Sequence, residues 1–264
     1  MNKNISLTLA FSCLGNTLTS LLNNLELITA RENLKILVIV QKWEAKQPEQ
    51  QSKKIDLVYL DNIGLSRSRN TAIRHANTNY IWFLDDDVAL ENKDIDDVLN
   101  IIQTGVTEFY RVKVGCIEWK NKLFKKYKKL EKVRKINLLQ VSSIEIIANL
   151  DYVKKTQLLF NENMGLGTVY PCNEENNFLI DAWDSGAKFT FVDKVLIRHT
   201  CIFDDRILAS DKIFEIKGAT ASRFNFLGVL LLCRWFFRFS ILHKNLGYGM
   251  SLIKGFLRGY KHYK

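Results

Sequence analysis

Three adjacent aspartates, Asp85, Asp86 and Asp87, are the strongest candidates for chemistry in this chain of 264 residues. They directly follow residues 80–84, YIWFL, which have the composition of a buried strand. Adjacent carboxylates repel one another unless a cation or hydrogen-bond donors gather them. A solvated acidic turn or a helix cap is the alternative interpretation. Because so apolar a strand belongs in the middle of a sheet, its end should open into a site, and we expect Mg2+ or Mn2+ there.

A second candidate site precedes the aspartates, at residues 64–70, GLSRSRN. Arginines and hydroxyls at the start of a helix, beside outward-pointing backbone amides, bind a phosphate or an electron-rich heterocycle. Two arginines in a first helical turn also oppose the helix dipole. We therefore expect an anionic group to offset that cost.

The elements that position these residues form an α/β pattern. Apolar runs at 5–11, 34–41, 55–60 and 80–84 predict strands, and helical spacing predicts helices at 16–27 and from about Gly64 or Ser66 onward. This order indicates a mostly parallel sheet, in which ligands bind at the carboxyl ends of the strands. Residues 1–15 contain no small-x-small cleavage site, so we interpret them as leading into the first strand and not as a signal peptide.

Three blocks of the sequence resemble family 2 glycosyltransferases with the Rossmann-like GT-A fold. Residues 64–88, GLSRSRNTAIRHANTNYIWFLDDDV, resemble the family's core signature. Residues 160–181, FNENMGLGTVYPCNEENNFLID, resemble its acceptor-side block, and residues 188–199, KFTFVDKVLIRH, resemble its closing strands, which end in a histidine. The resemblance spans roughly residues 5–200 in the family's order, which is far more specific than a single Asp-x-Asp pattern. It implies transfer of a sugar from a nucleotide-sugar donor.

The resemblance also implies roles for the donor-site residues. Asp85 would lie near the ribose, Asp87 would ligate the metal that bridges the two phosphates, and Asp86 takes the tolerant middle position. His199 resembles the late histidine that completes the metal shell in some members, with a purely structural role as the alternative. The cation would neutralise the departing nucleoside diphosphate. The remaining residues implied at the nucleotide are Ala10, Ser12, Gln41, Gly64, Ser66 and Arg69.

Two of these positions carry particular expectations. Arg69 would contact the base or a phosphate. Gln41 departs from the acidic residue that is usual in the family, which leaves the identity of the base open. Because an amide has both a donor and an acceptor, it can pair with a pyrimidine edge, and we expect a UDP-linked donor.

The acidic pair Glu174 and Glu175 resembles the family's Glu-Asp motif, whose second residue is the general base. Glu175 is therefore the implied base and Glu174 the fallback, in an inverting transfer that needs no covalent intermediate. The alternative is that two acids merely suit the first turn of a helix that closes at Gly186. Gly165 and Gly167 would shape the acceptor side through close approach of the backbone.

Composition and charge set the expected surroundings. Five scattered cysteines without a C-x-x-C pair argue against a zinc site and against a secreted disulfide framework, so we expect the reducing cytosol. The net charge is +10, and residues 118–135 are rich in lysine, which indicates either a solvated helical face or a surface for anionic lipid or nucleic acid.

The C-terminal segment decides between these partners. Residues 224–242 contain an apolar run, 226–233, that is too short to span a bilayer, beside Arg234 and Arg238. Lys254 and Arg258 continue this basic pattern. We predict an amphipathic helix in a membrane interface, with a core helix packed on the catalytic domain as the alternative. An anionic membrane surface is therefore the expected partner, and no nucleic acid is expected.

These observations predict a GT-A domain at residues 1–205, with a nucleotide-binding half at 1–90 and an acceptor-binding half at 91–205. Residues 206–264 would form a helical, membrane-associating extension. We expect a metal-dependent, inverting hexosyltransferase of polysaccharide biosynthesis, cytoplasmic and peripheral on the inner face of the cell membrane, with a glycan or lipid-linked acceptor. The alternatives are a nucleotidyltransferase, against which Glu174, Glu175 and His199 speak, and a noncatalytic basic binding protein, which leaves the aspartates unexplained.

Overall fold

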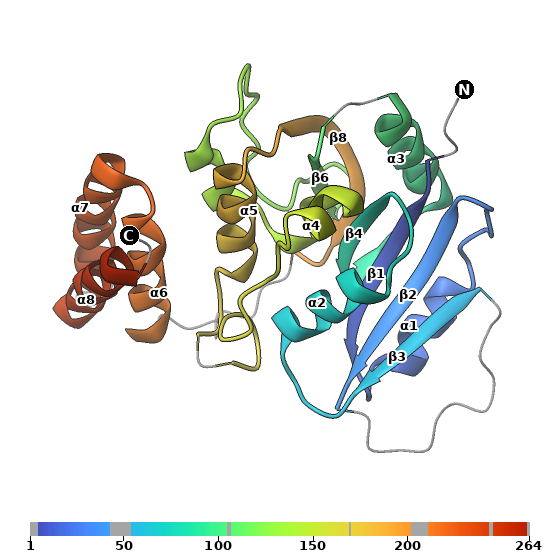
Figure 1. Ribbon diagram of the computed structural model, residues 1–264, viewed down its shortest axis with the longest axis horizontal. Helices are drawn as coiled ribbons and strands as arrows, with labels where there is room; N and C mark the ends of the chain where they lie inside the picture. The colour runs from blue at the N-terminus through green and yellow to red at the C-terminus, as the bar shows by residue number, and fades with distance from the viewer. Residues whose placement is uncertain are drawn as a thin grey trace.

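A mixed sheet forms the framework of the protein in a computed structural model that describes residues 5–42, 54–104, 107–168, 170–201, 211–242 and 245–262. Across these residues the sheet has eight strands in the order β3-β2-β1-β4-β7-β6-β8-β5 (Figure 1). The strands are β1 (Leu7–Leu14), β2 (Leu34–Gln41), β3 (Ile55–Leu60), β4 (Tyr80–Asp85), β5 (Val88–Ala89), β6 (Phe109–Cys116), β7 (Ile146–Asn149) and β8 (Phe189–His199).

The first four strands run parallel and confirm the predicted α/β pattern. Strands β2 and β3 have the predicted bounds, whereas β1 extends beyond residue 11 because its pairing with β2 continues to Leu14, opposite Gln41. On the other side of β1, Ser12 lies opposite Asp85. The carboxyl ends of β1, β2 and β4 therefore meet at one edge of the sheet.

The second half of the sheet is mixed in direction. Strand β7 pairs antiparallel with both β4 and β6, and β6 pairs parallel with β8. The short β5, just after the three aspartates, pairs antiparallel with the end of β8, where Val88 lies opposite His199. This pairing brings two chain segments from opposite halves of the domain to the same edge.

Helices cover both faces of the sheet, which explains the nearly continuous apolar strands. Apolar side chains of α1 (Leu18–Leu25) and α3 (Asn92–Thr104) join one buried cluster with alternate residues of β1. A second cluster, on the other face, holds apolar side chains of α2 (Leu65–His75), α4 (Leu150–Lys155) and α5 (Glu174–Asp184). Ala10 belongs to this second cluster.

Two expectations about the chain between these elements are wrong. The lysine-rich segment is not a helical face, because residues 117–134 contain no helix and lead only into two short 3-10 helices, η1 (Lys135–Gln140) and η2 (Ser143–Glu145). The cysteine pattern argued against disulfides, yet Cys116 at the end of β6 is bonded to Cys201, just beyond β8.

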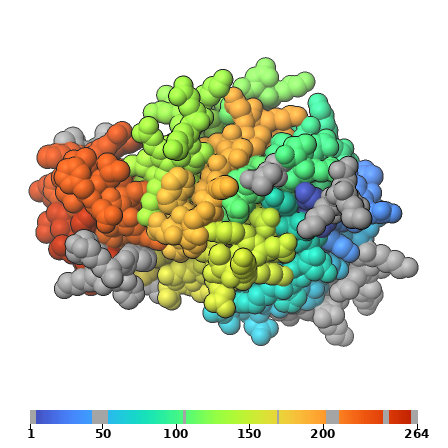
Figure 2. All heavy atoms as spheres, turned by 45° about the horizontal axis from the view of Figure 1, so that its top comes forward, coloured from blue at the N-terminus to red at the C-terminus, as the bar shows by residue number. Residues whose placement is uncertain are grey.

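The predicted helical extension is confirmed as three helices, α6 (Asp211–Ser222), α7 (Asn225–Leu242) and α8 (Leu246–His262). They form a lobe at one end of the molecule, with α5 between them and the sheet (Figures 1 and 2). Helices α6 and α8 touch through glycines: a Cβ at Gly255 would lie 1.8 Å from the backbone oxygen of Glu215. Among the described residues, every helix is too short or too polar to cross a membrane.

Candidate active site

The three aspartates lie at the edge where the parallel strands end, and each faces a different partner. Asp85 lies near Arg69, and the Thr17 hydroxyl, in the turn after β1, donates to Asp86. The Asp87 Oδ2 atom lies 3.1 Å from Nε2 of His199. The pairing of β5 with β8 produces this last contact, because it aligns the residue after Asp87 with His199.

The contact between Asp87 and His199 has the length of a hydrogen bond. Nδ1 of His199 lies 2.8 Å from the Thr200 carbonyl oxygen. A carbonyl oxygen only accepts, so Nδ1 carries a hydrogen and fixes the ring. Nε2 of a neutral ring then faces the carboxylate with a lone pair, which is stable only with a proton or a metal ion between them.

The spacing of the two atoms fits two ligands of one ion. Neighbouring ligands at about 2.1 Å from a six-coordinate ion lie about 3 Å apart. Magnesium-type sites often use one or two protein ligands and complete the shell with phosphate and water. Among the described residues no group of three or more His, Cys, Asp or Glu side chains is arranged to hold a metal. The metal set Asp85, Asp87 and His199 therefore stays a prediction.

The protonation of this pair follows from its surroundings. Burial alone would lower the pKa of His199, but the hydrogen bonds to Asp87 and to the Thr200 carbonyl raise it above its usual value. The hydrogen bond from His199 in turn lowers the pKa of Asp87. The hydrogen bond therefore favours the charged form of each group, and a metal ion bound by both would take the place of the shared proton.

Arg69 is buried between the donor-side and acceptor-side acids. Its Nη1 donates to Oε1 of Glu174 at 2.8 Å, and its Nη2 donates to Oδ1 of Asp85 at 3.2 Å. The side chain is 2% exposed, and Nε has no hydrogen-bond partner in the described part of the chain. Burial raises the pKa of Asp85 despite this arginine. A contact between Arg69 and the nucleotide stays a prediction.

The other residues predicted at the nucleotide are brought together only in part. Oε1 of Gln41 accepts from the Gly64 backbone nitrogen at 2.7 Å, so these two residues meet at the end of β2. Ser12 shares a hydrogen bond of 2.7 Å with Ser68 of α2. Ala10, in contrast, is 3% exposed and lies in the core, four residues before the end of β1.

Ser66 points toward the acceptor-side loop and not into the nucleotide edge. Its hydroxyl donates to the Met164 carbonyl oxygen at 2.6 Å. The next residue, Gly165, has φ 97°, and a Cβ there would lie 3.2 Å from both Ser66 Oγ and Glu174 Cδ. Gly165 thus allows the loop backbone to pack against the acids, as a residue with a side chain would not.

Glu174 and Glu175 occupy the first turn of α5, which begins directly after Asn173 in the left-handed conformation. Glu174 is held by Arg69, whereas burial and the neighbouring Glu174 carboxylate raise the pKa of Glu175 to about 8. A carboxyl group that loses its proton near neutral pH has the proton affinity of a general base. The raised pKa of Glu175 therefore suits proton transfer.

A buried charge network near these acids was not predicted. Glu145 is 0% exposed. Its Oε2 accepts from Arg111 Nε at 2.7 Å, its Oε1 accepts from the Tyr127 hydroxyl at 2.8 Å, and Lys125 Nζ lies 2.7 Å from the same Oε1. Burial lowers the pKa of Lys125, and the charges of Glu145 and Glu175 oppose that shift. Lys125, in the lysine-rich segment, therefore turns toward Glu145. The residues come from distant segments, so no motif signals the network.

Comparison with known proteins places the chain in a family. The model of the family "Glycosyl transferase family 2" matches residues 10–150, more than half of the chain. A search among curated proteins finds no match.

Solved structures similar to the chain include several of S. aureus TarS. TarS 1-349 in complex with UDP-GlcNAc has a TM-score of 0.69 at 13% identity, with 97% of this chain and 82% of that chain covered. TarS 1-349 in complex with UDP has a TM-score of 0.59 at 14% identity, with 83% and 65% covered. A further TarS structure has a TM-score of 0.61 at 14% identity, and there the match covers 82% of this chain but only 39% of that chain.

The structural similarity supports the assignment of the fold, and the family model supports the assignment to a protein family. At 13–14% identity, the likeness to TarS shows a shared GT-A architecture and no more. The family match extends from the middle of β1 to the start of α4 and includes the three aspartates and Arg69. It favours a sugar-transferring enzyme over the nucleotidyltransferase and the noncatalytic binding protein. The chain belongs to glycosyl transferase family 2 and has a GT-A fold.

Proposed function

We propose that the protein transfers a sugar from a UDP-linked donor to a hydroxyl group of a glycan or lipid-linked acceptor, with a divalent metal and with inversion. The observation that carries this proposal is the arrangement at the sheet edge. Asp87 Oδ2 and His199 Nε2 lie 3.1 Å apart, which fits two ligands of one ion, and Arg69 links Asp85 to Glu174, next to the candidate base. The TarS structures with UDP and UDP-GlcNAc support a uridine nucleotide as the donor carrier.

The donor half binds the leaving group. Asp85 would contact the ribose, and Gln41 would offer its remaining amide hydrogens to the base while its oxygen holds Gly64. A Mn2+ or Mg2+ ion bound by Asp87 and His199 would supply positive charge to the diphosphate. Arg69 keeps Asp85 in place, because a buried guanidinium with two carboxylate partners has little freedom to move.

The acceptor half activates the nucleophile. Glu175 takes the proton from the acceptor hydroxyl as that oxygen attacks the anomeric carbon from the face opposite the diphosphate. The new carbon–oxygen bond forms while the bond to the diphosphate breaks, so the electron pair leaves with the diphosphate and the configuration inverts. No enzyme nucleophile is needed, because a single displacement completes the transfer.

The C-terminal helices supply a membrane-facing surface in this proposal. Large apolar side chains on α7 and α8 are exposed, namely Phe226, Leu227, Val229, Leu230, Phe237, Leu246, Met250 and Leu257. Arg234 and Arg238 lie exposed on the same helix α7. Exposed apolar side chains beside basic side chains favour binding of α7 and α8 to an anionic lipid surface. The protein would then be peripheral on the inner face of the membrane.

The proposed organisation of the chain follows from these roles. Residues 1–90 bind the nucleotide, residues 91–205 bind the acceptor, and residues 206–264 face the membrane. The boundary at 205 and 206 lies outside the described residues.

Thermal stabilisation by nucleotides tests the donor site. UDP or a UDP-sugar should raise the melting midpoint of the wild type only with Mn2+, and Asp87→Asn should remove that metal dependence. Asp56→Asn, at an exposed aspartate on β3, is the matched control and should respond like the wild type. The proposal fails if no uridine nucleotide stabilises the wild type with metal, or if Asp87→Asn responds as the wild type does.

A further inference from the structure

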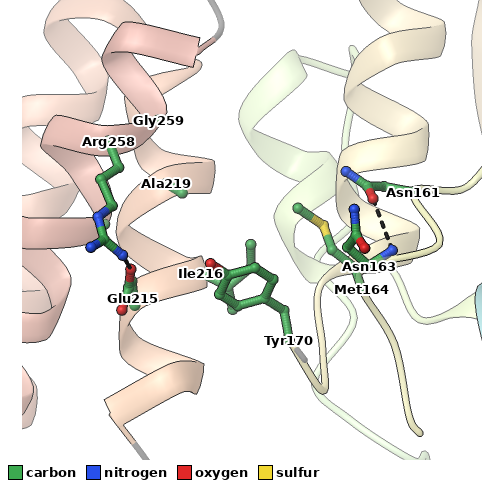
Figure 3. Close-up of a pocket in the computed structure, with 10 residues that line it drawn as sticks. Asn161, Asn163, Met164, Tyr170, Glu215, Ile216, Ala219, Arg258 and Gly259 are labelled. Carbon is green, nitrogen blue, oxygen red and sulfur yellow. Dashed lines mark hydrogen bonds and ion pairs between the residues drawn. The ribbon is translucent and has the colours of Figure 1, made fainter. Parts of the chain in front are cut away.

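A cavity of about 410 Å3 lies outside the donor site, between the loop formed by residues 161–168 and Tyr170 and the helices α6 and α8 (Figure 3). Its size is within the roughly 300–1,000 Å3 of sites that enclose small molecules. The residues that line it are Asn161, Asn163, Met164, Tyr170, Glu215, Ile216, Ala219, Gly255, Arg258 and Gly259. None of them has a part in the donor chemistry described above.

The lining combines an aromatic ring with planar polar groups. The Tyr170 ring projects from the loop toward Ile216 of α6, while Asn161 and Asn163 stand on the loop side (Figure 3). A pyranose ring has apolar C–H faces, which pack on an aromatic ring, and hydroxyl groups at its edge, which pair with amides and carboxylates. The apolar lining with polar groups at its rim therefore suits the two kinds of surface that a sugar presents.

The charged side chains of the cavity compensate one another. Arg258 of α8 donates to Glu215 of α6, and Lys254 Nζ lies 3.6 Å from the same carboxylate. Two cations thus neutralise the carboxylate of Glu215, which is the one carboxylate among the described residues that line the cavity. This carboxylate is therefore not left unpaired to bind a metal ion. Matched groups can still exchange hydrogen bonds with a neutral hydroxyl.

The helical wall of the cavity is closely packed. A Cβ at Gly259 would lie 2.5 Å from Ser222 Oγ and 2.8 Å from Ala219 Cα. A Cβ at Gly255 would come even closer to α6, 1.8 Å from the backbone oxygen of Glu215. Neither glycine can be replaced by a larger residue without moving α8 away from α6. The cavity therefore has one wall fixed by helix packing and one wall formed by the loop.

The loop wall connects the cavity to the candidate base. Met164 lines the cavity, and its carbonyl oxygen accepts the hydroxyl of Ser66. The next residue, Gly165, packs directly against Glu174. Met164 and Gly165, which are adjacent in the loop, thus border the cavity and the acidic pair respectively, so the cavity adjoins the acceptor half of the site.

We infer that this cavity binds one neutral sugar unit of the acceptor, remote from the hydroxyl that reacts. This inference rests on the proposed function and adds to it that the acceptor is a glycan recognised at more than one unit. Tyr170 provides the stacking surface, and Asn161 provides an amide at the rim.

The test measures binding of methyl glycosides of glucose, galactose, mannose and N-acetylglucosamine by saturation-transfer NMR. At least one glycoside should bind the wild type, and Tyr170→Ala should weaken it at least about tenfold, because a stacked ring contributes roughly that factor. Tyr170→Phe keeps the ring and should change the affinity less than about threefold. Ala219→Phe fills the cavity from α6 and should abolish binding even if Tyr170→Ala fails to fold.

The inference is overturned if no methyl glycoside binds the wild type, or if binding is the same in Tyr170→Ala or Ala219→Phe. Binding of octyl glycosides alone also overturns it, since the cavity would then take the alkyl chain. The wild type is titrated in parallel with UDP and Mn2+. A wild type that binds UDP but no glycoside disproves only the sugar site, whereas loss of UDP binding disproves the proposed function.

Discussion

Nη1 of Arg69 donates to Oε1 of Glu174 at 2.8 Å, across 105 residues of sequence. The same guanidinium reaches Asp85, so one buried cation joins the end of β4 to the start of α5. The donor-side aspartate and the acidic pair that holds the candidate base thereby share one anchor. A change at Arg69 should therefore act on both sides of the reaction.

Arg69→Ala should lower the free energy of unfolding by about 3–5 kcal/mol, because it leaves the buried Glu174 carboxylate and the half-buried Asp85 carboxylate without their cation. Arg67→Ala is the matched control. Arg67 is 45% exposed and lies 3.3 Å from Glu162, so its loss should cost about 0–1 kcal/mol. Urea denaturation of both variants measures the difference. Equal destabilisation by the two substitutions would contradict the anchoring role of Arg69.

The transfer rate should rise with pH up to about 8, because the raised pKa of Glu175 leaves the base protonated below that value. Each unit below the pKa should lower kcat about tenfold, whereas Glu175→Gln should lower kcat by about 10²–10⁴ above pH ~8 and remove this pH dependence. A pH–rate profile of the wild type and the variant checks both statements. A wild-type rate that stays level down to pH 6 would show that Glu175 is not the base.

His199→Ala should raise the Mn2+ concentration needed for half-maximal stabilisation by UDP at least about tenfold, since it removes one candidate ligand. His75→Ala is the control: His75 lies at the exposed end of α2, where Nδ1 contacts the Thr71 carbonyl oxygen at 3.0 Å. The Mn2+ concentration that His75→Ala needs for half-maximal stabilisation should match that of the wild type. An unchanged Mn2+ requirement in His199→Ala would assign the histidine a purely structural role.

Replacing Phe226 and Phe237 together by serine should weaken binding to phosphatidylserine vesicles at least about tenfold. The two rings are 73% and 62% exposed on α7. Leu27→Ser removes an equally exposed apolar residue, 77% exposed beyond α1, and should leave vesicle binding intact. Vesicle sedimentation at low and moderate salt measures both. Retention of binding in the double variant would rule out α7 as the contact surface.

Local patterns predicted the parallel half of the sheet well. Strands 34–41 and 55–60 have the predicted ends because their apolar side chains pack into the clusters on both faces of the sheet. The aspartates at the end of β4 could be located for the same reason. These features depend on residues that are neighbours in the chain.

Features that depend on distant contacts could not be predicted. The segment around Tyr127 is not helical, because its hydroxyl accepts from the Val114 backbone nitrogen and donates to Glu145, which ties the chain to β6. The bond between Cys116 and Cys201 joins residues 85 apart, and an odd number of scattered cysteines gives no sign of it. The position of Arg69 suggested an anion from outside the protein, whereas two of the protein's own carboxylates hold it.

Release of UDP from UDP-sugars, followed with and without Mn2+, measures metal-dependent sugar transfer at this site. We predict that the wild type releases UDP from at least one UDP-sugar only when Mn2+ is present, and that Asp87→Asn and Glu175→Gln each lower the rate at least about 100-fold. Release that needs no metal, or release at the wild-type rate in both variants, would contradict it.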